Sequence, residues 1–135
     1  MPKQEMNSSK QQSNFIWVTT QFEGFHKYPN APLEVSFLKN KHRHLFGVKV
    51  WIEVFHNERD IEFILFKRFV ESKLNGKCDN RSCEEISDLL HSEIVNKYPN
   101  REIRIEINED KENGSYKEYA KKNNWWNTNN KRSLR

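Results

Sequence analysis

The feature that most restricts the fold is a strict alternation of apolar residues in two segments far apart in the sequence. From about His42 to Phe55, every second position is apolar at Val48, Val50, Ile52 and Val54. From Glu102 to Glu109, the same pattern appears at Ile103, Ile105 and Ile107. Successive side chains of a strand point to opposite faces, so both segments are predicted to be strands with one buried face.

Two amphipathic helices are predicted between these strands. Residues Ile61 to Leu74 carry an apolar stripe at helical spacing, and Asn75–Gly76 follows as a stop signal. Ser82 with Glu85 three residues later has the pattern of a capping box. It opens a second helix that ends before Pro99.

Two more strands complete the predicted sheet. Residues Asn14 to Phe22 have a strand-like composition, and Asn113–Gly114 is a turn signal before a last strand from Ser115 to Ala120. Residues Leu33 to Leu38 fit either a short extended piece or a turn. The predicted order is β-β-α-α-β-β, an α+β fold with a four-stranded antiparallel sheet and two helices on one face.

The chain divides into one domain and two tails. We expect residues 1–13 to be a disordered tail, 14–119 the folded domain and 120–135 a basic tail. No apolar run approaches the roughly 20 residues that span a bilayer, and Met1 to Gln12 lacks the apolar stretch of a secretory signal. A cytoplasmic protein with no membrane association is therefore expected, in which Cys78 and Cys83 are free thiols.

The C-terminal tail combines positive charge with aromatic side chains. Trp125 and Trp126 lie among asparagines, and the tail has no acid beside its cations, which are Lys121, Lys122, Lys131, Arg132 and Arg135. Such a segment can stack on and neutralise single-stranded nucleic acid. The alternative is a solvated tail, favoured by the near balance of charge in the rest of the chain.

Three histidines form a candidate metal site. His42 and His44 are two apart at the start of a predicted strand, so both imidazoles face the same side. A third nitrogen can come from His26, in the loop after the preceding strand, if the two strands pair as a hairpin. Three histidines leave the fourth position of zinc open, as in catalytic sites. The alternative is a solvated basic turn, because Lys39, Lys41 and Arg43 flank the pair.

Several segments together resemble the 6-pyruvoyl-tetrahydropterin synthase and 6-carboxy-tetrahydropterin synthase family. They are Phe22-Glu23-Gly24-Phe25-His26, His42-Arg43-His44, Arg59-Asp60-Ile61-Glu62-Phe63, Leu74–Asn75, Ser82-Cys83-Glu84-Glu85-Ile86-Ser87 and the strand ending at Glu109. The resemblance covers about residues 14 to 119. It implies the tunnelling fold, zinc bound by His26, His42 and His44, and a homo-oligomer, a trimer or hexamer, with sites between subunits. Open sheet edges also favour edge-to-edge assembly.

The chain departs from the family at its catalytic positions. Leu38 stands where the family has a catalytic Cys, and Val70 and Glu71 stand where it has an Asp-His pair. Neither Leu38 nor Val70 can move a proton. Glu71, Glu34 or Cys78 would have to replace the missing base if the chain were a zinc-dependent lyase acting on dihydroneopterin triphosphate.

The ligand-binding residues implied by the resemblance are better preserved. A strand-end carboxylate accepts two hydrogen bonds from the N–H/NH2 edge of a pterin or guanine. Glu109 is the first candidate for this carboxylate and Glu106 the second; Glu84, in the segment Ser82 to Ser87, is a further candidate ligand-binding residue. The other interpretation of Glu109 is a solvated acid within a run of charged residues. Arg43 could neutralise a phosphate. The favoured hypothesis is a protein that binds a purine- or pterin-like small molecule, for example to sequester or sense a nucleotide metabolite, with catalysis altered or lost.

Overall fold

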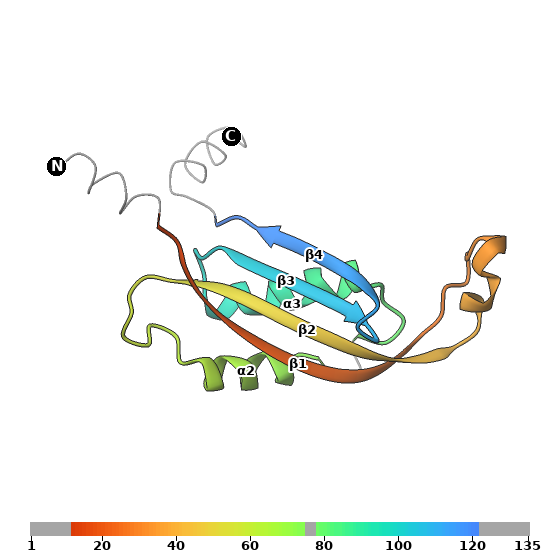
Figure 1. Ribbon diagram of the computed structural model, residues 1–135, viewed down its shortest axis with the longest axis horizontal. Coiled ribbons are helices and arrows are strands. Elements are labelled where there is room, and N and C mark those ends of the chain that lie inside the picture. Colours follow the sequence, from red (N-terminus) through yellow and green to blue (C-terminus); the bar gives the residue numbers. More distant parts are fainter. Residues whose placement is uncertain (1–11, 75–77, 122–135) are drawn as a thin grey trace, which may run out of the picture.

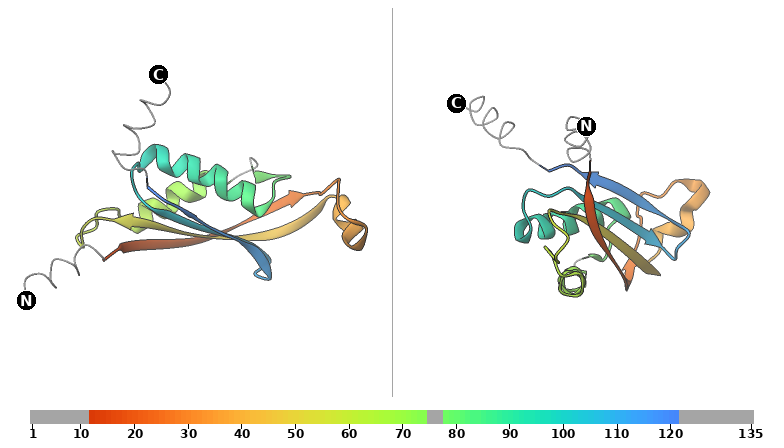
Figure 2. Two further views of the ribbon diagram at one scale, coloured as in Figure 1. Left: turned by 90° about the horizontal axis from the view of Figure 1, so that it is seen from above. Right: turned by 60° about the vertical axis from the view of Figure 1, so that its left-hand side comes forward.

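The computed structural model describes residues 12–74 and 78–121, and it confirms the predicted α+β order (Figure 1). The strands form one antiparallel sheet in the order β1-β2-β3-β4. Both helices lie on the same side of this sheet (Figure 2). The elements are β1 (Asn14–His26), η1 (Leu33–Lys39), β2 (His42–Val54), α2 (Phe63–Ser72), α3 (Cys83–Lys97), β3 (Ile103–Glu109) and β4 (Asn113–Tyr119).

The core lies between the sheet and the two helices. The predicted alternation is confirmed, because the apolar residues of β2 and β3 face the helices and are buried. From the helices, Phe66, Val70, Ile86, Leu90 and Ile94 pack against them. Each such side chain stabilises the fold by about 1.5–3 kcal/mol when it leaves water. We call the helix-covered side of the sheet the helix face and the other side the open face.

The β1–β2 hairpin extends beyond the other strands. β3 pairs only with Phe46–Ile52 of β2, whereas β1 pairs with β2 as far as His26, opposite His42. β1 is therefore longer than the predicted segment, which stopped at Phe22. Gly24 permits this continuation, because a Cβ there would lie 2.9 Å from the Phe46 ring. The segment left undecided between extended and turn is the 3-10 helix η1 at the hairpin tip.

Side-chain caps and one loop position the helices. The capping box of Ser82 and Glu85 is confirmed at the start of α3. Before it, the backbone N–H of Asn80 donates to the Phe25 carbonyl at 2.9 Å, and Asp79 accepts from the Phe25 N–H at 3.3 Å. These bonds hold the N-terminus of α3 beside the extended hairpin.

Other sequence predictions have different outcomes. Cys78 and Cys83 are free, as expected, and both are buried. Among the described helices, none has the length and apolar content needed to cross a membrane. Residues 1–11 and 122–135, the greater part of the two predicted tails, lie outside the described residues.

Candidate functional site

His42 and His44 lie together on the helix face, in the part of β2 that extends beyond β3. Their ring centroids are 4.6 Å apart and the rings meet edge to face. The prediction that both imidazoles share one face is therefore confirmed. The ring of Phe46, next on this face, lies 5.9 Å from that of His44 and forms an apolar floor.

An oxygen acceptor holds the Nδ1 atom of each histidine. His42 Nδ1 lies 2.7 Å from the Asn40 carbonyl oxygen, and His44 Nδ1 lies 2.7 Å from Oδ2 of Asp110. A carbonyl and a carboxylate can only accept, so both Nδ1 atoms donate. In the neutral imidazole, the lone pair then resides on Nε2, which is the arrangement found for metal-ligating histidines.

His26 lies across the hairpin from this pair. The strand register makes His26 the Cα partner of His42 and Gly24 the Cα partner of His44. The side chain of His26 is outside the described part of the structure. Among the side chains that are described, no three His, Cys, Asp or Glu form a group that could hold a metal ion. The backbone register therefore places His26 beside His42 and His44 at the end of the hairpin.

Asp110 links this site to the end of β3. Its Oδ1 accepts from the Leu45 N–H at 2.9 Å, and its own N–H donates to the Leu45 carbonyl at 2.7 Å. The hydrogen bond from His44, followed by that from the Leu45 N–H, lowers the pKa of the Asp110 carboxyl. Asp110 is therefore an anion that orients His44.

A pocket of about 670 Å³ opens beside the histidines, and Glu109 is on its wall. Glu109 is the last residue of β3, and its side chain lies on the helix face. The distance between its Oε2 atom and Nε2 of His44 is 3.6 Å. The rest of the wall comes from the hairpin tip (Lys27, Tyr28, Pro29, Leu38), from the start of α3 and its preceding loop (Asn80 to Glu85), and from Asn113 and Gly114. The pocket thus collects residues from three separate parts of the chain.

Cys83 lies between the pocket and the core. Its Sγ is 3.9 Å from Oε1 of Glu109. Burial, with the nearby charges of Glu109 and Glu84, raises the pKa of the thiol to about 12. At neutral pH this side chain is a neutral thiol, a poor nucleophile and a poor base.

The structure separates the predicted ligand-binding residues into two groups. Glu84 lines the same pocket as Glu109. Glu106 lies on the open face. It is three residues before Glu109 on β3, and an odd separation along a strand places two side chains on opposite faces. Arg43 is also on the open face, where it forms an ion pair of 3.1 Å with Glu23.

The candidate catalytic acids lie outside the pocket wall. Glu71 on α2 accepts a hydrogen bond of 2.8 Å from the Thr20 hydroxyl, and Glu34 is in the first turn of η1. Leu38 does line the pocket, whereas Val70 is fully buried in the core.

Sequence reasoning missed the roles of Asp110, Asn40 and Cys83. Asp110 was seen only as part of an acidic run, and Asn40 contributes a backbone carbonyl that carries no sequence signal. Cys83 had a usable signal, because it follows the N-cap Ser82 and so must lie in the first turn of α3. No protein-family model matches the chain, and no curated protein is significantly similar to it.

Proposed function

We propose that this protein binds a purine- or pterin-like small molecule in the pocket beside Glu109, next to a metal site formed by His26, His42 and His44. The observation that carries the proposal is the position of Glu109, on the pocket wall and 3.6 Å from His44 Nε2. A carboxylate there can accept two hydrogen bonds from the N–H/NH2 edge of a heterocycle. Tyr28, on the same wall and about half exposed, offers an aromatic surface to the ring.

The chemistry of the histidines supports a bound metal, with zinc as the candidate. Two neighbouring imidazoles have Nδ1–H groups held by oxygen acceptors, which leaves Nε2 as the ligating atom. Such an ion would supply positive charge for an oxygen or nitrogen atom of the ligand. The residues of the chain would orient that ligand and shield it from water.

Binding without turnover is the favoured activity. Leu38 occupies pocket wall without a titratable group, and Cys83 remains a neutral thiol because its pKa is raised to about 12. Glu71 of α2 accepts a hydrogen bond from the Thr20 hydroxyl of β1. A protein with these residues can sequester or sense a metabolite without moving its protons.

Self-assembly is part of the proposal, as a trimer or hexamer. β1 and β4 are the edge strands of the described sheet, and an exposed edge pairs readily with another chain. Beside β1, Phe63, Ile64 and Leu65 of α2 are each more than half exposed. A groove of about 580 Å³ between β1 and α2 could receive a strand from a second copy.

The first experiment compares ligand binding by two carboxylates of the same strand. A panel of pterins, purine nucleosides and purine nucleotides is titrated calorimetrically into wild type, Glu109→Gln and Glu106→Gln. We expect at least one compound to bind, and Glu109→Gln to weaken it about tenfold or more, since hydrogen bonds to charged groups contribute about 1.5–3 kcal/mol. Glu106→Gln, on the open face, should bind like wild type. Equal loss in both variants, or no binding by any compound, would contradict the proposal.

The second experiment measures the metal content of the purified protein. Wild type should contain about one zinc per chain, and His42→Ala/His44→Ala should lose it. His56→Ala is the matched control, because His56 lies just beyond the C-terminal end of β2, away from His42 and His44, and is exposed. The absence of metal in folded wild-type protein would remove the metal from the proposal and leave the Glu109 pocket to be tested by itself.

A further inference from the structure

The open face of the sheet carries an aromatic and cationic strip that the proposed pocket does not use. Trp17 of β1 and Trp51 of β2 are Cα partners on this face. Lys49 Nζ lies 4.4 Å from the centroid of the Trp17 ring and 4.8 Å from that of the Trp51 ring. Tyr116 of β4 meets Trp51 edge to face, at 5.8 Å between centroids. Trp17 is 56% exposed and Tyr116 is 50% exposed.

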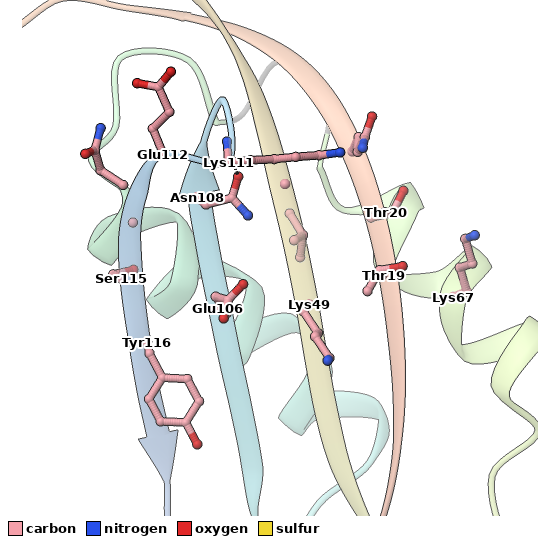
Figure 3. Close-up of a pocket in the computed structure, with 15 residues that line it drawn as sticks. Thr19, Thr20, Lys49, Lys67, Glu106, Asn108, Lys111, Glu112, Ser115 and Tyr116 are labelled. Atoms are coloured by element: carbon pink, nitrogen blue, oxygen red, sulfur yellow. Dashed lines mark hydrogen bonds between the residues drawn. The ribbon is translucent and has the colours of Figure 1, made fainter.

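A broad hollow of about 920 Å³ adjoins this strip. Thr19, Lys49, Glu106 and Tyr116 follow one another across β1, β2, β3 and β4 along its length (Figure 3). Gly47 of β2 is the Cα partner of Asn108 of β3, and a Cβ on Gly47 would lie 2.6 Å from Nδ2 of Asn108. The missing side chain leaves room for the Asn108 amide at the floor of the hollow. The result is a long, open surface with stacking groups and polar groups, unlike the pocket beside Glu109.

The charges around the hollow suit an extended anion. Lys49 and Glu106 line it from the sheet, Lys111 and Glu112 from the turn between β3 and β4, and Lys67 from α2 (Figure 3). Lys49 is held between two indole rings, so its ammonium group is already positioned.

We propose that the open face binds single-stranded nucleic acid, with bases stacked on Trp17 and Tyr116 and phosphates contacted by Lys49 and Lys111. Proteins that bind single strands without sequence preference combine aromatic stacking surfaces with cations that follow the backbone. The stacking groups lie on β1 and β4 and the cations on β2 and in the turn after β3, and this spread fits several successive nucleotides better than one small molecule. This surface is on the opposite side of the sheet from Glu109, so it is separate from the ligand pocket. Trp17 also lines the groove between β1 and α2 that the proposed self-assembly would use.

The test uses the full chain and a fluorescein-labelled oligo-dT of about 20 nucleotides, followed by fluorescence anisotropy at several salt concentrations. Each stacked base contributes about five- to 150-fold in affinity, so Trp17→Ala/Tyr116→Ala should weaken binding at least tenfold. Phe37→Ala is the control, because Phe37 is a 68% exposed aromatic residue on η1, away from the open face. Thermal melting of each variant checks that it is folded.

Two further variants separate the face from the tail. Lys49→Gln should reduce the slope of log affinity against log salt by about 0.7–1, as expected for one lost phosphate contact. Trp125→Ala/Trp126→Ala should retain most of the affinity and remain sensitive to Trp17→Ala/Tyr116→Ala. The proposal is overturned if wild type does not bind, if the Phe37 control weakens binding as much as the face variant, or if only the tail substitutions matter. If Trp17→Ala/Tyr116→Ala does not fold, the proposal is tested by Lys49→Gln: an unchanged slope of log affinity against log salt overturns it.

Discussion

His44 donates a hydrogen bond from Nδ1 to Oδ2 of Asp110 at 2.7 Å, while Oδ1 of the same carboxylate accepts from the Leu45 N–H at 2.9 Å. The carboxylate therefore fixes both the tautomer and the orientation of the His44 ring. Because Asp110 immediately follows Glu109, the last residue of β3 is the acid that faces the pocket and the first residue after β3 is the acid that orients the histidine. The metal-binding proposal thus depends on a residue that would not itself touch the ion.

Asp110→Asn should weaken zinc binding while leaving the fold intact. An amide in place of the carboxylate cannot hold the imidazole as strongly, and loss of such a supporting partner typically costs about 10- to 100-fold in metal affinity. Competition with a chromophoric chelator measures the change. Glu58→Gln removes one exposed negative charge at the other end of β2 and should retain wild-type affinity. Equal affinity in Asp110→Asn and wild type would show that this hydrogen bond does not support a metal site.

Cys83 should be nearly inert toward thiol reagents in the native protein. A pKa of about 12 leaves roughly one side chain in 10⁴ as thiolate at pH 8, and thiolate is the reactive form. Cys78 is also buried, and desolvation raises the pKa of its thiol. A disulfide-exchange assay should report little reaction in buffer and two thiols per chain after unfolding in urea. Rapid modification of native Cys83 would mean that this part of the pocket wall opens readily.

The strands and helices were predictable because their patterns are local. The alternation in β2 and β3, the apolar stripe of α2 and the capping box of α3 each occupy one short segment. The length of β1 was not predictable in the same way. Its last residues, up to His26, are in a strand because β2 continues opposite them, and the 3-10 helix η1 closes that long hairpin.

The candidate site was only partly predictable, since it depends on strand register. Period-two geometry places Arg43 on the opposite face from His42 and His44, and it places Glu106 opposite Glu109. The sequence contains that information once the buried face of each strand is known. The hydrogen bond between Asp110 and His44 joins residues 66 positions apart. No local sequence pattern predicts this hydrogen bond.

Asp60→Asn should destabilise the protein in a pH-dependent manner. Asp60 forms a salt bridge of 2.9 Å with Arg101, and both side chains are mostly buried. The hydrogen bond from Arg101, followed by that from the Phe55 N–H, lowers the pKa of this carboxyl below its usual 3.8. A lowered pKa in the folded state stabilises the protein fully above the unfolded value, and that stabilisation is lost as pH falls through the folded value.

Urea unfolding at pH 7 should therefore give a free energy of unfolding about 1–3 kcal/mol lower for Asp60→Asn than for wild type. The difference should stay constant down to about pH 5 and shrink below pH 4. Glu58→Gln, exposed in the same turn region, should change the free energy by less than about 0.5 kcal/mol. A pH-independent difference for Asp60→Asn would attribute the loss to packing instead of charge.

Tyr119→Phe alone should destabilise the protein more than the double variant Ser87→Ala/Tyr119→Phe, which removes both partners of the hydrogen bond between these two side chains. The Tyr119 hydroxyl lies 2.9 Å from Oγ of Ser87, which is fully buried in α3, and it donates to Oδ1 of Asp88 at 2.6 Å. Phenylalanine leaves the Ser87 hydroxyl buried without this partner, at a cost of about 1–3 kcal/mol. Ser87→Ala added to Tyr119→Phe removes that buried polar group, so part of the lost stability should return.

Thermal and urea unfolding of the two single variants and the double variant form a cycle whose coupling energy isolates the Ser87–Tyr119 contact. Tyr116→Phe is the matched control, because Tyr116 is on the same strand but half exposed on the open face. It should unfold within about 0.5 kcal/mol of wild type. Additive single changes would mean that β4 is held to α3 without this bond, through contacts such as the stacking of His91 on Tyr119 at 3.9 Å and the hydrogen bond of 2.6 Å from Lys117 to Asp88.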